Sequence, residues 1–302
     1  MAVTGLGTEE NPFIVHSYDE IKSCIEGLSD DQLHYLKLGN NIDCKDYGES
    51  FEWATISVNW TNRRFDFDLN GHTIQNVKIG TNQTMFIYSG QASRIHDGKL
   101  LNIFLDQSYG LTDAYGGAYA DFDFENISIS VSGMGLKSNH QAFRYIRFKK
   151  CAVYYETNVL NSDYEIMYNN DLGGGGANVI NSDIIIKCDN QNQRYFFKDE
   201  VKFEACRIRG YTKGSAPYSG NYNNQRCTFK NSFTSCIFEF DNREYVGYAP
   251  KFIINFDANS GCVINKDIIA DVGSSWNFVT TEQIRNGSAL RSAGFPVINV
   301  QP

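Results

Sequence analysis

A repeat of about 24 to 31 residues constrains this 302-residue chain more than any other feature of its sequence. Eight short segments fall into register when the chain is aligned with itself on an anchor position. The anchor column contains Val77, Ile103, Ile127, Cys151, Ser182, Cys206, Cys236 and Cys262. A unit this short cannot bury its own apolar face, so neighbouring units must stack to form a continuous core.

Two further columns are apolar and give each unit the alternation of a strand with one buried face. Two residues after the anchor come Ile79, Leu105, Ile129, Val153, Ile184, Ile208, Phe238 and Ile264. Three residues before it come Ile74, Leu100, Phe124, Phe148, Val179, Phe203 and Phe233, and the last unit breaks this column with Asn259. Each unit is therefore predicted to be a strand, a tight bend, a second strand and a longer return path.

Asparagine precedes the anchor in three successive units, at Asn76, Asn102 and Asn126. Asparagine tolerates the left-handed backbone conformation that a sharp bend between two strands requires. The pair Asn70-Gly71 is by itself a strong hairpin signal. The columns favour a turn that leads into the first coil, so strand 77–79 is predicted to pair in parallel with 103–105.

These patterns predict an all-β fold, a right-handed parallel β-helix, because the leucine-rich repeat of similar length has a signature that is missing here. One domain over 1–302 is expected, with an N-terminal cap (1–32), coils (33–272) and a C-terminal cap (273–302). In the first cap, Ser17 and Glu20 have the spacing of a capping box before a helix containing Ile21, Cys24 and Ile25. In the second cap, a helix from about Thr281 carries Ile284 and Leu290, ends at Gly294 and precedes a final strand.

Composition excludes several classes of protein. The formal net charge is −8 and no cluster of basic residues stands out, which argues against a nucleic-acid surface. No apolar run approaches the roughly 18 residues of a membrane span, and the N-terminal segment does not resemble a secretory signal. The eight cysteines form no CxxC pair and no zinc-like spacing, so those in the anchor column are interpreted as small buried hydrophobes.

The opening pattern GTxxNPFIVxSxDE, the DLNGHTIxN coil and the ending TTEQIRNGSALRSAGFPVI resemble pectate-lyase-like β-helix proteins of bacteriophage virions. Tail spikes, baseplate appendages and head-surface proteins belong to this group. The resemblance implies a virion protein assembled in the host cytoplasm, a homotrimer, and contacts with other virion proteins or a host-surface glycan. Fold resemblance alone does not specify an activity, because such scaffolds also host lyases, hydrolases and adhesins.

The sequence predicts no catalytic residues, no metal ligands and no cofactor. The Gly-His-Gly of a polygalacturonase fails at Thr73, and Arg207-Ile208-Arg209 has arginine where lysine is needed. Glu125 and Glu204 share an outward column but are three units apart, about 14 Å, which exceeds both glycosidase geometries. The acidic residues Asp113, Asp121 and Asp123 are explained as solvated loop carboxylates, and the five histidines share no metal-site spacing.

Segments that interrupt the repeat are the predicted binding regions. They span 106–121, 155–177 and 209–228, and two of them mix tyrosine with glycine, serine and asparagine, as adaptable recognition loops do. The candidate binding residues are Tyr109, Tyr115, Tyr119, Tyr211, Tyr218 and Tyr222. Contact with another virion subunit, binding of a glycan or receptor, and a plain loop all remain open for them.

Three functional hypotheses follow. The first is a non-enzymatic virion protein that binds the host surface or decorates the particle. The alternative is a carbohydrate-active tail-spike enzyme, a polysaccharide lyase or glycoside hydrolase, which would require two or three carboxylates within about 10 Å of one another in a groove. A bacterial surface adhesin is a third reading, and it would require a signal or anchor.

Overall fold

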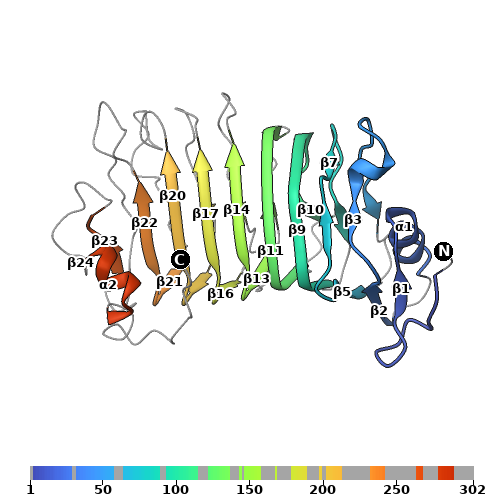
Figure 1. The fold of residues 1–302 in the computed structure, drawn as a ribbon, viewed down its shortest axis with the longest axis horizontal. Coiled ribbons are helices and arrows are strands. Elements are labelled where there is room, and N and C mark those ends of the chain that lie inside the picture. Colours follow the sequence, from blue (N-terminus) through green and yellow to red (C-terminus); the bar gives the residue numbers. More distant parts are fainter. Residues whose placement is uncertain are drawn as a thin grey trace.

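The computed structural model describes residues 3–28, 32–57, 64–88, 93–114, 122–136, 143–144, 146–157, 167–168, 178–188, 197–198, 202–212, 232–241, 263–267 and 278–288. These residues form an elongated parallel β-solenoid in which successive strands lie side by side from one end to the other (Figure 1). Every ladder between the described strands is parallel, and each joins strands about one repeat apart except the last, where Ile264 pairs with Phe278.

Two ladders run along the molecule and merge through two long strands, β9 (Ser93–Ser108) and β11 (Phe122–Leu136). The first ladder continues through β1 (Phe13–Val15), β2 (Leu33–Leu38), β5 (Arg64–Asp68), β13 (Ile146–Lys149), β16 (Asn178–Ile180), β19 (Lys202–Glu204) and β21 (Ser232–Thr234). The second contains β3 (Ile42–Asp43), β6 (Thr73–Gln75), β7 (Lys78–Ile79), β14 (Ala152–Thr157), β17 (Asp183–Cys188), β20 (Arg207–Thr212), β22 (Ile237–Asp241), β23 (Val263–Asn265) and β24 (Phe278–Val279).

The return path of the coils also contains strands, which the sequence columns did not predict. They form two separate three-stranded sheets. One contains β4 (Ile56–Ser57), β8 (Phe86–Tyr88) and β10 (Thr112–Ala114), and the other contains β12 (Phe143–Arg144), β15 (Met167–Tyr168) and β18 (Phe197–Lys198). The coils of the solenoid therefore have strands on more sides than the two that were predicted.

Left-handed residues mark the bends between strands. Asn76, Asn102 and Asn126 have φ values of 57°, 52° and 52°, which confirms the predicted conformation. The residue before the anchor is also left-handed in the later coils, at Lys150, Asn181, Ala205 and Ser235, with φ between 49° and 55°. The bend is thus repeated even where its residue is not asparagine.

The turn at Asn70-Gly71 is not a hairpin. Both residues have positive φ, and β5 before the turn pairs in parallel with β9 instead of folding back on β6. The predicted partner of strand 77–79 is confirmed, because Lys78 pairs with Phe104 and Ile79 with Leu105.

One step of the predicted register is wrong. The columns place Ile127 on Ile103, but Ile127 pairs with Gly98, and Ile103 pairs with Val131. The cause is that β9 bends at the left-handed residue Asp97 and again at Asn102, with Gln107 as a third such residue near its end, whereas Asn126 supplies a single one in β11.

The other columns shift at the same place. Leu100 pairs with Ile129 instead of Phe124, and Phe124 pairs with Ile95 on one side and Phe148 on the other. Beyond this junction the predicted register holds, as in the pairing of Ile129 with Val153.

The surplus residues form a β-bulge, in which Leu101 and Asn102 of β9 lie opposite Ser130 of β11. The Ser130 hydroxyl accepts a hydrogen bond from the Asn102 N–H at 2.8 Å, so the amide displaced from the ladder is still satisfied.

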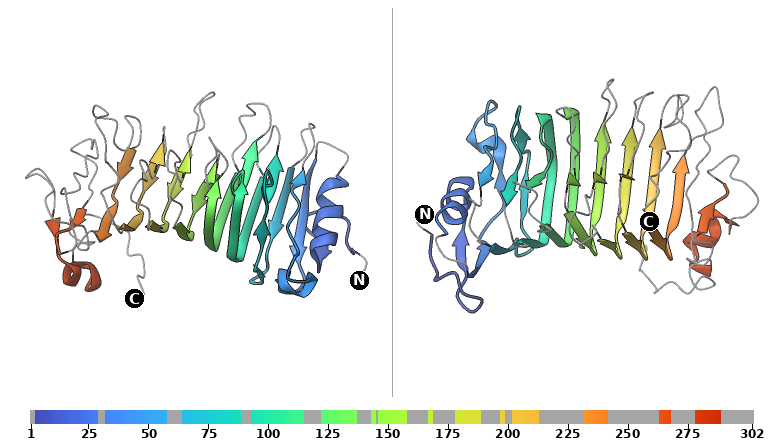
Figure 2. Two further views of the ribbon diagram at one scale, coloured as in Figure 1. Left: turned by 90° about the horizontal axis from the view of Figure 1, so that it is seen from above. Right: turned by 180° about the vertical axis from the view of Figure 1, so that it is seen from behind.

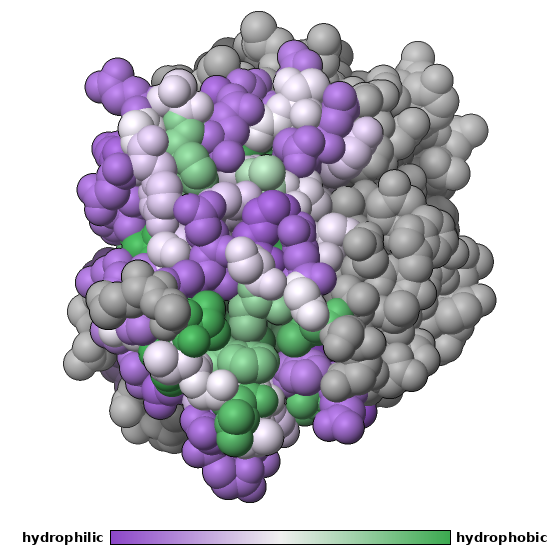
Figure 3. Space-filling view, turned by 90° about the vertical axis from the view of Figure 1, so that its right-hand side faces the viewer, coloured by the Kyte–Doolittle hydropathy of each residue, from purple (hydrophilic) through white to green (hydrophobic). Residues whose placement is uncertain are grey.

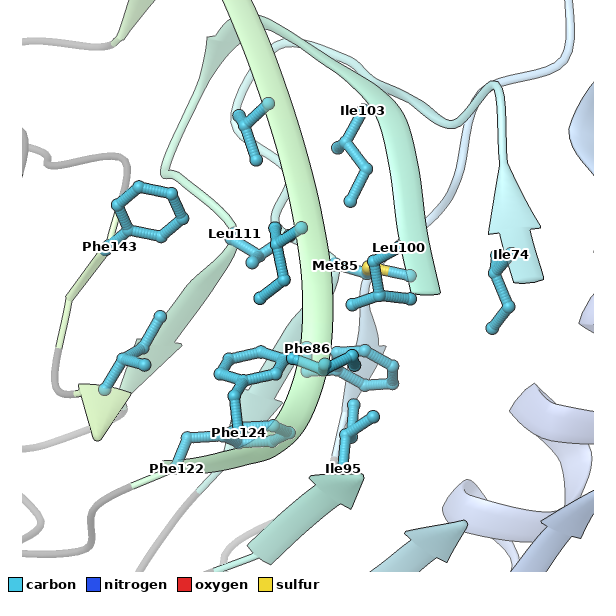
Figure 4. Packing of buried hydrophobic residues seen from close by; sticks show 14 of the residues in the cluster. Ile74, Met85, Phe86, Ile95, Leu100, Ile103, Leu111, Phe122, Phe124 and Phe143 are labelled. Atoms are coloured by element: carbon cyan, nitrogen blue, oxygen red, sulfur yellow. The ribbon is translucent and has the colours of Figure 1, made fainter. Parts of the chain in front are cut away.

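The three predicted columns point inward wherever their side chains are described, and all of these are at most 3 % exposed. Phe124 stacks on Phe148 of the next coil with ring centroids 5.7 Å apart, and it lies beside the tilted ring of Phe122 on its own strand at 5.1 Å. Figure 4 shows this cluster, where Phe86 and Ile95 meet the same rings from neighbouring strands. Each such side chain contributes about 1.5–3 kcal/mol by burial.

The anchor-column cysteines Cys151, Cys206 and Cys236 are buried. The thiols of Cys151 and Cys206 donate hydrogen bonds to the carbonyl oxygens of Phe124 and Val179, respectively, at 3.1 Å. Burial raises the pKa of the Cys151 thiol to about 12, so this thiol stays protonated. The three buried side chains occupy the positions of small hydrophobes, as predicted. Cys262 lies outside the described residues.

The N-terminal end is covered by α1 (Tyr18–Glu26), which packs Ile21 and Ile25 against the core and leaves Cys24 half-buried. The Ser17 hydroxyl accepts a hydrogen bond from the Glu20 N–H. The Glu20 carboxylate accepts from the His16 N–H at 2.7 Å, one residue before the position that a capping box would use.

Figure 3 looks onto this end, where mostly polar residues surround a smaller hydrophobic area. Leu6, 72 % exposed, is among the few large apolar side chains that are exposed in the described part of the chain. A 3-10 helix, η1 (Cys44–Tyr47), follows β3.

The other end carries α2 (Thr281–Arg285), which begins where the sequence predicts and buries Ile284 (Figures 1 and 2). Its capping box joins Thr280 and Gln283. Leu290, Gly294 and the predicted final strand lie outside the described residues. Neither described helix is long and apolar enough to cross a membrane.

Candidate functional site: the charged outer face of the first ladder

The structure describes little of the predicted tyrosine site. Tyr109 is partly exposed just after β9, and its N–H donates a hydrogen bond to the Gln83 carbonyl at 2.8 Å. Tyr211 lies in β20, where its backbone pairs with Lys187 and Asp241. Tyr115, Tyr119, Tyr218 and Tyr222 fall outside the described residues, as does the side chain of Tyr211, so their grouping remains a prediction.

The predicted excursions begin later than the sequence indicates. Residues 106–108 belong to β9, 112–114 form β10, and 210–212 extend β20. Most of these residues continue as strands because they find parallel partners in a neighbouring coil, as Gly210 does with Ile186 and Phe240.

Charged side chains instead gather on the outer face of the first ladder. In β5 the buried Phe65 and Phe67 alternate with Asp66 and Asp68, whose side chains face away from the core. The parallel register then places opposite charges in adjacent strands. Asp66 pairs with Arg94, Arg94 with Asp123, and Asp123 with Arg147.

Asp66 is the centre of this face, because it is only 7 % exposed although it is charged. Its Oδ2 atom accepts hydrogen bonds from Arg94 Nε at 3.0 Å and Nη2 at 2.6 Å, while Oδ1 lies 2.6 Å from His96 Nε2. Burial opposes ionisation of Asp66, but the hydrogen bonds from His96 and Arg94 outweigh it and hold its pKa below the ordinary value.

His96 lies between two carboxylates. Its Nε2 contacts Asp66, and its Nδ1 is 2.8 Å from Asp97 Oδ2. Burial disfavours the charged ring, but the hydrogen bonds to Asp66 and Asp97 outweigh this effect and raise the pKa of His96. Asp97 Oδ1 in turn accepts from Asn126 Nδ2 at 2.6 Å, so a polar chain crosses three successive coils.

The network continues toward β13. Arg94 Nη1 lies 3.4 Å from Glu125 Oε2, and Lys149 Nζ lies 2.9 Å from Glu125 Oε1. The hydrogen bond from Lys149 holds the pKa of Glu125 below its ordinary value. The predicted column that joins Glu125 to Glu204 exists, because Glu125, Lys149, Ile180 and Glu204 pair in succession.

The second ladder pairs its outer charges in the same way. Lys187 contacts Glu156, and Arg209 contacts Asp183, in both cases across adjacent coils. Near the C-terminal end, Arg207 contacts the buried Glu239.

Glu239 also connects the last coils to the C-terminal cap. Its Oε1 accepts from Asn265 Nδ2, which also donates to Thr281 Oγ1 at the start of α2. These contacts tie neighbouring coils and the cap together.

Among the described residues, Asp68, His96 and Asp97 form a group that could hold a metal ion, since their ligand atoms all lie within 4.8 Å of one another. Sequence spacing did not reveal it, because Asp68 is 28 residues before His96 and approaches it only through the parallel register. A usable signal exists: DFD at 66–68 and RIHD at 94–97 put complementary charges at equivalent positions of successive coils.

The fold and its ladders define the chain as a parallel β-solenoid. No protein-family model matches the chain, and no curated protein matches it in sequence. Among solved structures it is similar to a Bacteroides ovatus protein provisionally assigned as an immunoglobulin A1 protease, with 14% identity and a TM-score of 0.49 over 95% of this chain and 89% of that chain. A similarity this low transfers no activity to the present chain.

Proposed function

We propose that this chain is a non-enzymatic structural protein of a bacteriophage virion, displayed on the particle as a homotrimer. In this role it binds a host-surface glycan or decorates the virion beside other virion proteins. The pectate-lyase-like resemblance supplies the virion context. The motif GTxxNPFIVxSxDE, which carries part of that resemblance, lies in the segment that forms β1 and the start of α1.

One observation supports a structural role above others. The charged residues of the outer faces are engaged with one another from coil to coil, as in Asp66 with Arg94 and Lys187 with Glu156. Side chains used in this way hold a rod together, whereas a catalytic carboxylate must be free to reach a substrate. The helical caps at the two ends support the same role, because they limit end-to-end association of the strands.

The direct test is to locate the protein in purified particles. Mass spectrometry of virions and labelling with an antibody should find the chain at a fixed copy number that is a multiple of three. Sedimentation equilibrium of the isolated chain should give three times the monomer mass of 34.1 kDa. Absence from the particle would overturn the proposal.

A carbohydrate-active enzyme is the second candidate, and one observation favours it. Asp66 and Glu125 both approach Arg94 from strands on either side of β9. Two strand spacings and an offset of two residues along the strands separate their backbones by about 12 Å, and both side chains reach toward Arg94, which brings the carboxylates closer to the roughly 6.5–9.5 Å of inverting glycosidases. Release of reducing ends or unsaturated sugars from host capsule, abolished in both Asp66→Asn and Glu125→Gln, would establish this activity and refute the non-enzymatic reading.

A further inference from the structure

Both ring nitrogens of His96 lie within hydrogen-bonding distance of a carboxylate oxygen. Nε2 lies 2.6 Å from Asp66 Oδ1, and Nδ1 lies 2.8 Å from Asp97 Oδ2. A neutral imidazole has one N–H donor and one lone pair, and ionised carboxylates only accept. A neutral ring can therefore satisfy one of the two contacts, and the other requires either a proton on the second nitrogen or a metal ion bound between its lone pair and a carboxylate oxygen.

Burial decides which nitrogen carries the hydrogen of the neutral ring. Asp66 is nearly enclosed, and its Oδ2 already accepts two hydrogen bonds from Arg94, so Oδ1 needs a donor. Nε2–H supplies that donor, which leaves the lone pair on Nδ1. This lone pair faces Asp97, whose side chain is 50% exposed.

A second carboxylate lies near this ring. Asp68 is in direct register with His96 and belongs to the group whose ligand atoms lie within 4.8 Å of one another. A histidine that donates one N–H to a buried carboxylate and turns its other nitrogen toward further carboxylates has the usual arrangement of a metal ligand with its orienting partner.

We propose that Asp68, His96 Nδ1 and Asp97 bind one divalent transition-metal ion, such as zinc, with Asp66 as the positioning residue. One imidazole nitrogen with two carboxylate oxygens is a ligand set for zinc or manganese. This inference does not depend on the proposed function.

The charges around the site are consistent with a bound cation. Asp66, Asp68 and Asp97 supply three negative charges, and two positive charges lie near them, on Arg94 and on Lys37, whose Nζ is 3.5 Å from Asp68 Oδ2. Glu125 of β11 pairs with His96 in the ladder, and its carboxylate forms an ion pair with Lys149.

Small movements of the ligand side chains would bring their atoms to metal-binding distances. Zinc bonds of about 2.0–2.2 Å place ligand atoms roughly 3–4 Å apart. Nδ1 and Asp97 Oδ2 must therefore separate slightly while Asp68 approaches. The exposed Asp97 side chain can rotate, and Asn126 holds its Oδ1 from the next coil. The ion would join β5 to the left-handed bend at Asp97, and three protein ligands would leave a position for water.

The test uses the full chain, stripped with a chelator and titrated calorimetrically with zinc chloride at neutral pH. We expect one saturable site per chain and no comparable site for calcium. Asp97→Asn should weaken binding about tenfold or more while keeping an acceptor for Asn126, and Asp66→Asn should weaken it about 10–100-fold by releasing the ring orientation. His96→Gln should abolish the site.

Two controls separate this site from general zinc binding. His72→Gln removes a histidine from the neighbouring turn, and Asp123→Asn removes a carboxylate of the same face that is paired with Arg147. Both variants should bind zinc as the unchanged chain does.

Three results would overturn the proposal. One is the absence of saturable binding, and the second is equal affinity in His96→Gln and Asp97→Asn, each with an unaltered far-ultraviolet spectrum. The third is protonation of the ring in place of metal binding. Nitrogen-15 spectra would then show both His96 ring nitrogens protonated, with no change when zinc is added.

Discussion

The first coils and the later coils of the solenoid solve the same bending problem with different residues. Up to β9, the coils turn at several left-handed positions, which include Asn70, Asn76 and Asn82 in one coil and Asp97 and Asn102 in the next. The described parts of the next five coils have one such position each, occupied in turn by Asn126, Lys150, Asn181, Ala205 and Ser235.

Side chains at the early bends also hydrogen-bond to one another. Asn76 Nδ2 donates to Asp43 Oδ1 at 2.8 Å, and Asn102 Nδ2 donates to Asn76 Oδ1 at 2.5 Å. Lysine and alanine cannot form such a chain, yet they adopt the same φ. The stack of coils therefore imposes the bend, and asparagine lowers its free-energy cost.

The core gives the largest expected difference between the two regions. Phe124→Ala removes a ring that stacks on Phe148 and contacts the tilted ring of Phe122, and should lower the free energy of unfolding by about 3–5 kcal/mol. Ile184→Ala in the later, aliphatic part should cost less, about 2–4 kcal/mol. Urea denaturation followed by circular dichroism measures both, and a larger loss at Ile184 would show that the aromatic stack is not the stronger core.

The ion pairs on the outer faces should give the next largest difference in stability, between the first ladder and the second. Asp66→Ala leaves Arg94 and His96 without their common partner and should cost about 1–3 kcal/mol, because the Asp66 side chain is only 9% exposed. Asp183→Ala breaks the contact with Arg209 in the second ladder, where both side chains are about a third exposed, and should cost about 0–1 kcal/mol. Both are measured in metal-free buffer. Equal losses would mean that burial does not separate the two ladders.

Substitutions at two of the left-handed bends should change the stability in opposite directions. Lys150→Gly removes the strain of an exposed left-handed lysine and should stabilise the chain by about 0.5–1 kcal/mol. Asn126→Ala keeps the strain and loses the hydrogen bond to Asp97, so it should destabilise by about 1 kcal/mol. Thermal unfolding midpoints should move in opposite directions, and a loss of stability in Lys150→Gly would contradict an imposed bend.

Lowering the pH should give the smallest change in stability. Hydrogen bonds from Lys187 and Tyr154 hold the pKa of Glu156 below its ordinary value of 4.5. A carboxyl whose folded-state pKa is lowered stabilises the fold above its unfolded-state pKa, and this contribution is lost as pH falls through the folded-state value. The stability difference between the unchanged chain and Glu156→Gln should be constant near neutral pH and shrink below about pH 4.5. A difference that persists at lower pH would exclude ionisation as its cause.

Much of the scaffold could be predicted because its signals are local or periodic. The inward columns, the bends at Asn76 and Asn126, the start of α2 and the pairing of Ile79 with Leu105 all follow from residue spacing. The slip between β9 and β11 could not be predicted, because spacing alone does not tell whether Asn126 continues the bend of Asp97 or that of Asn102.

The charged face escaped prediction for a related reason. Asp66 and His96 are 30 residues apart, and their contact depends on which residues of successive coils become neighbours. The predicted tyrosines were chosen by composition, which indicates the character of a loop but fixes no position for its side chains.

The bulge opposite Ser130 gives the rod a direction. β9 has left-handed residues at Asp97, Asn102 and Gln107, whereas β11 has one, Asn126, so the cross-section changes partway along the axis. A partner that binds the side of the solenoid would contact a differently shaped surface toward each end. It could therefore distinguish the two orientations of the rod from backbone shape alone.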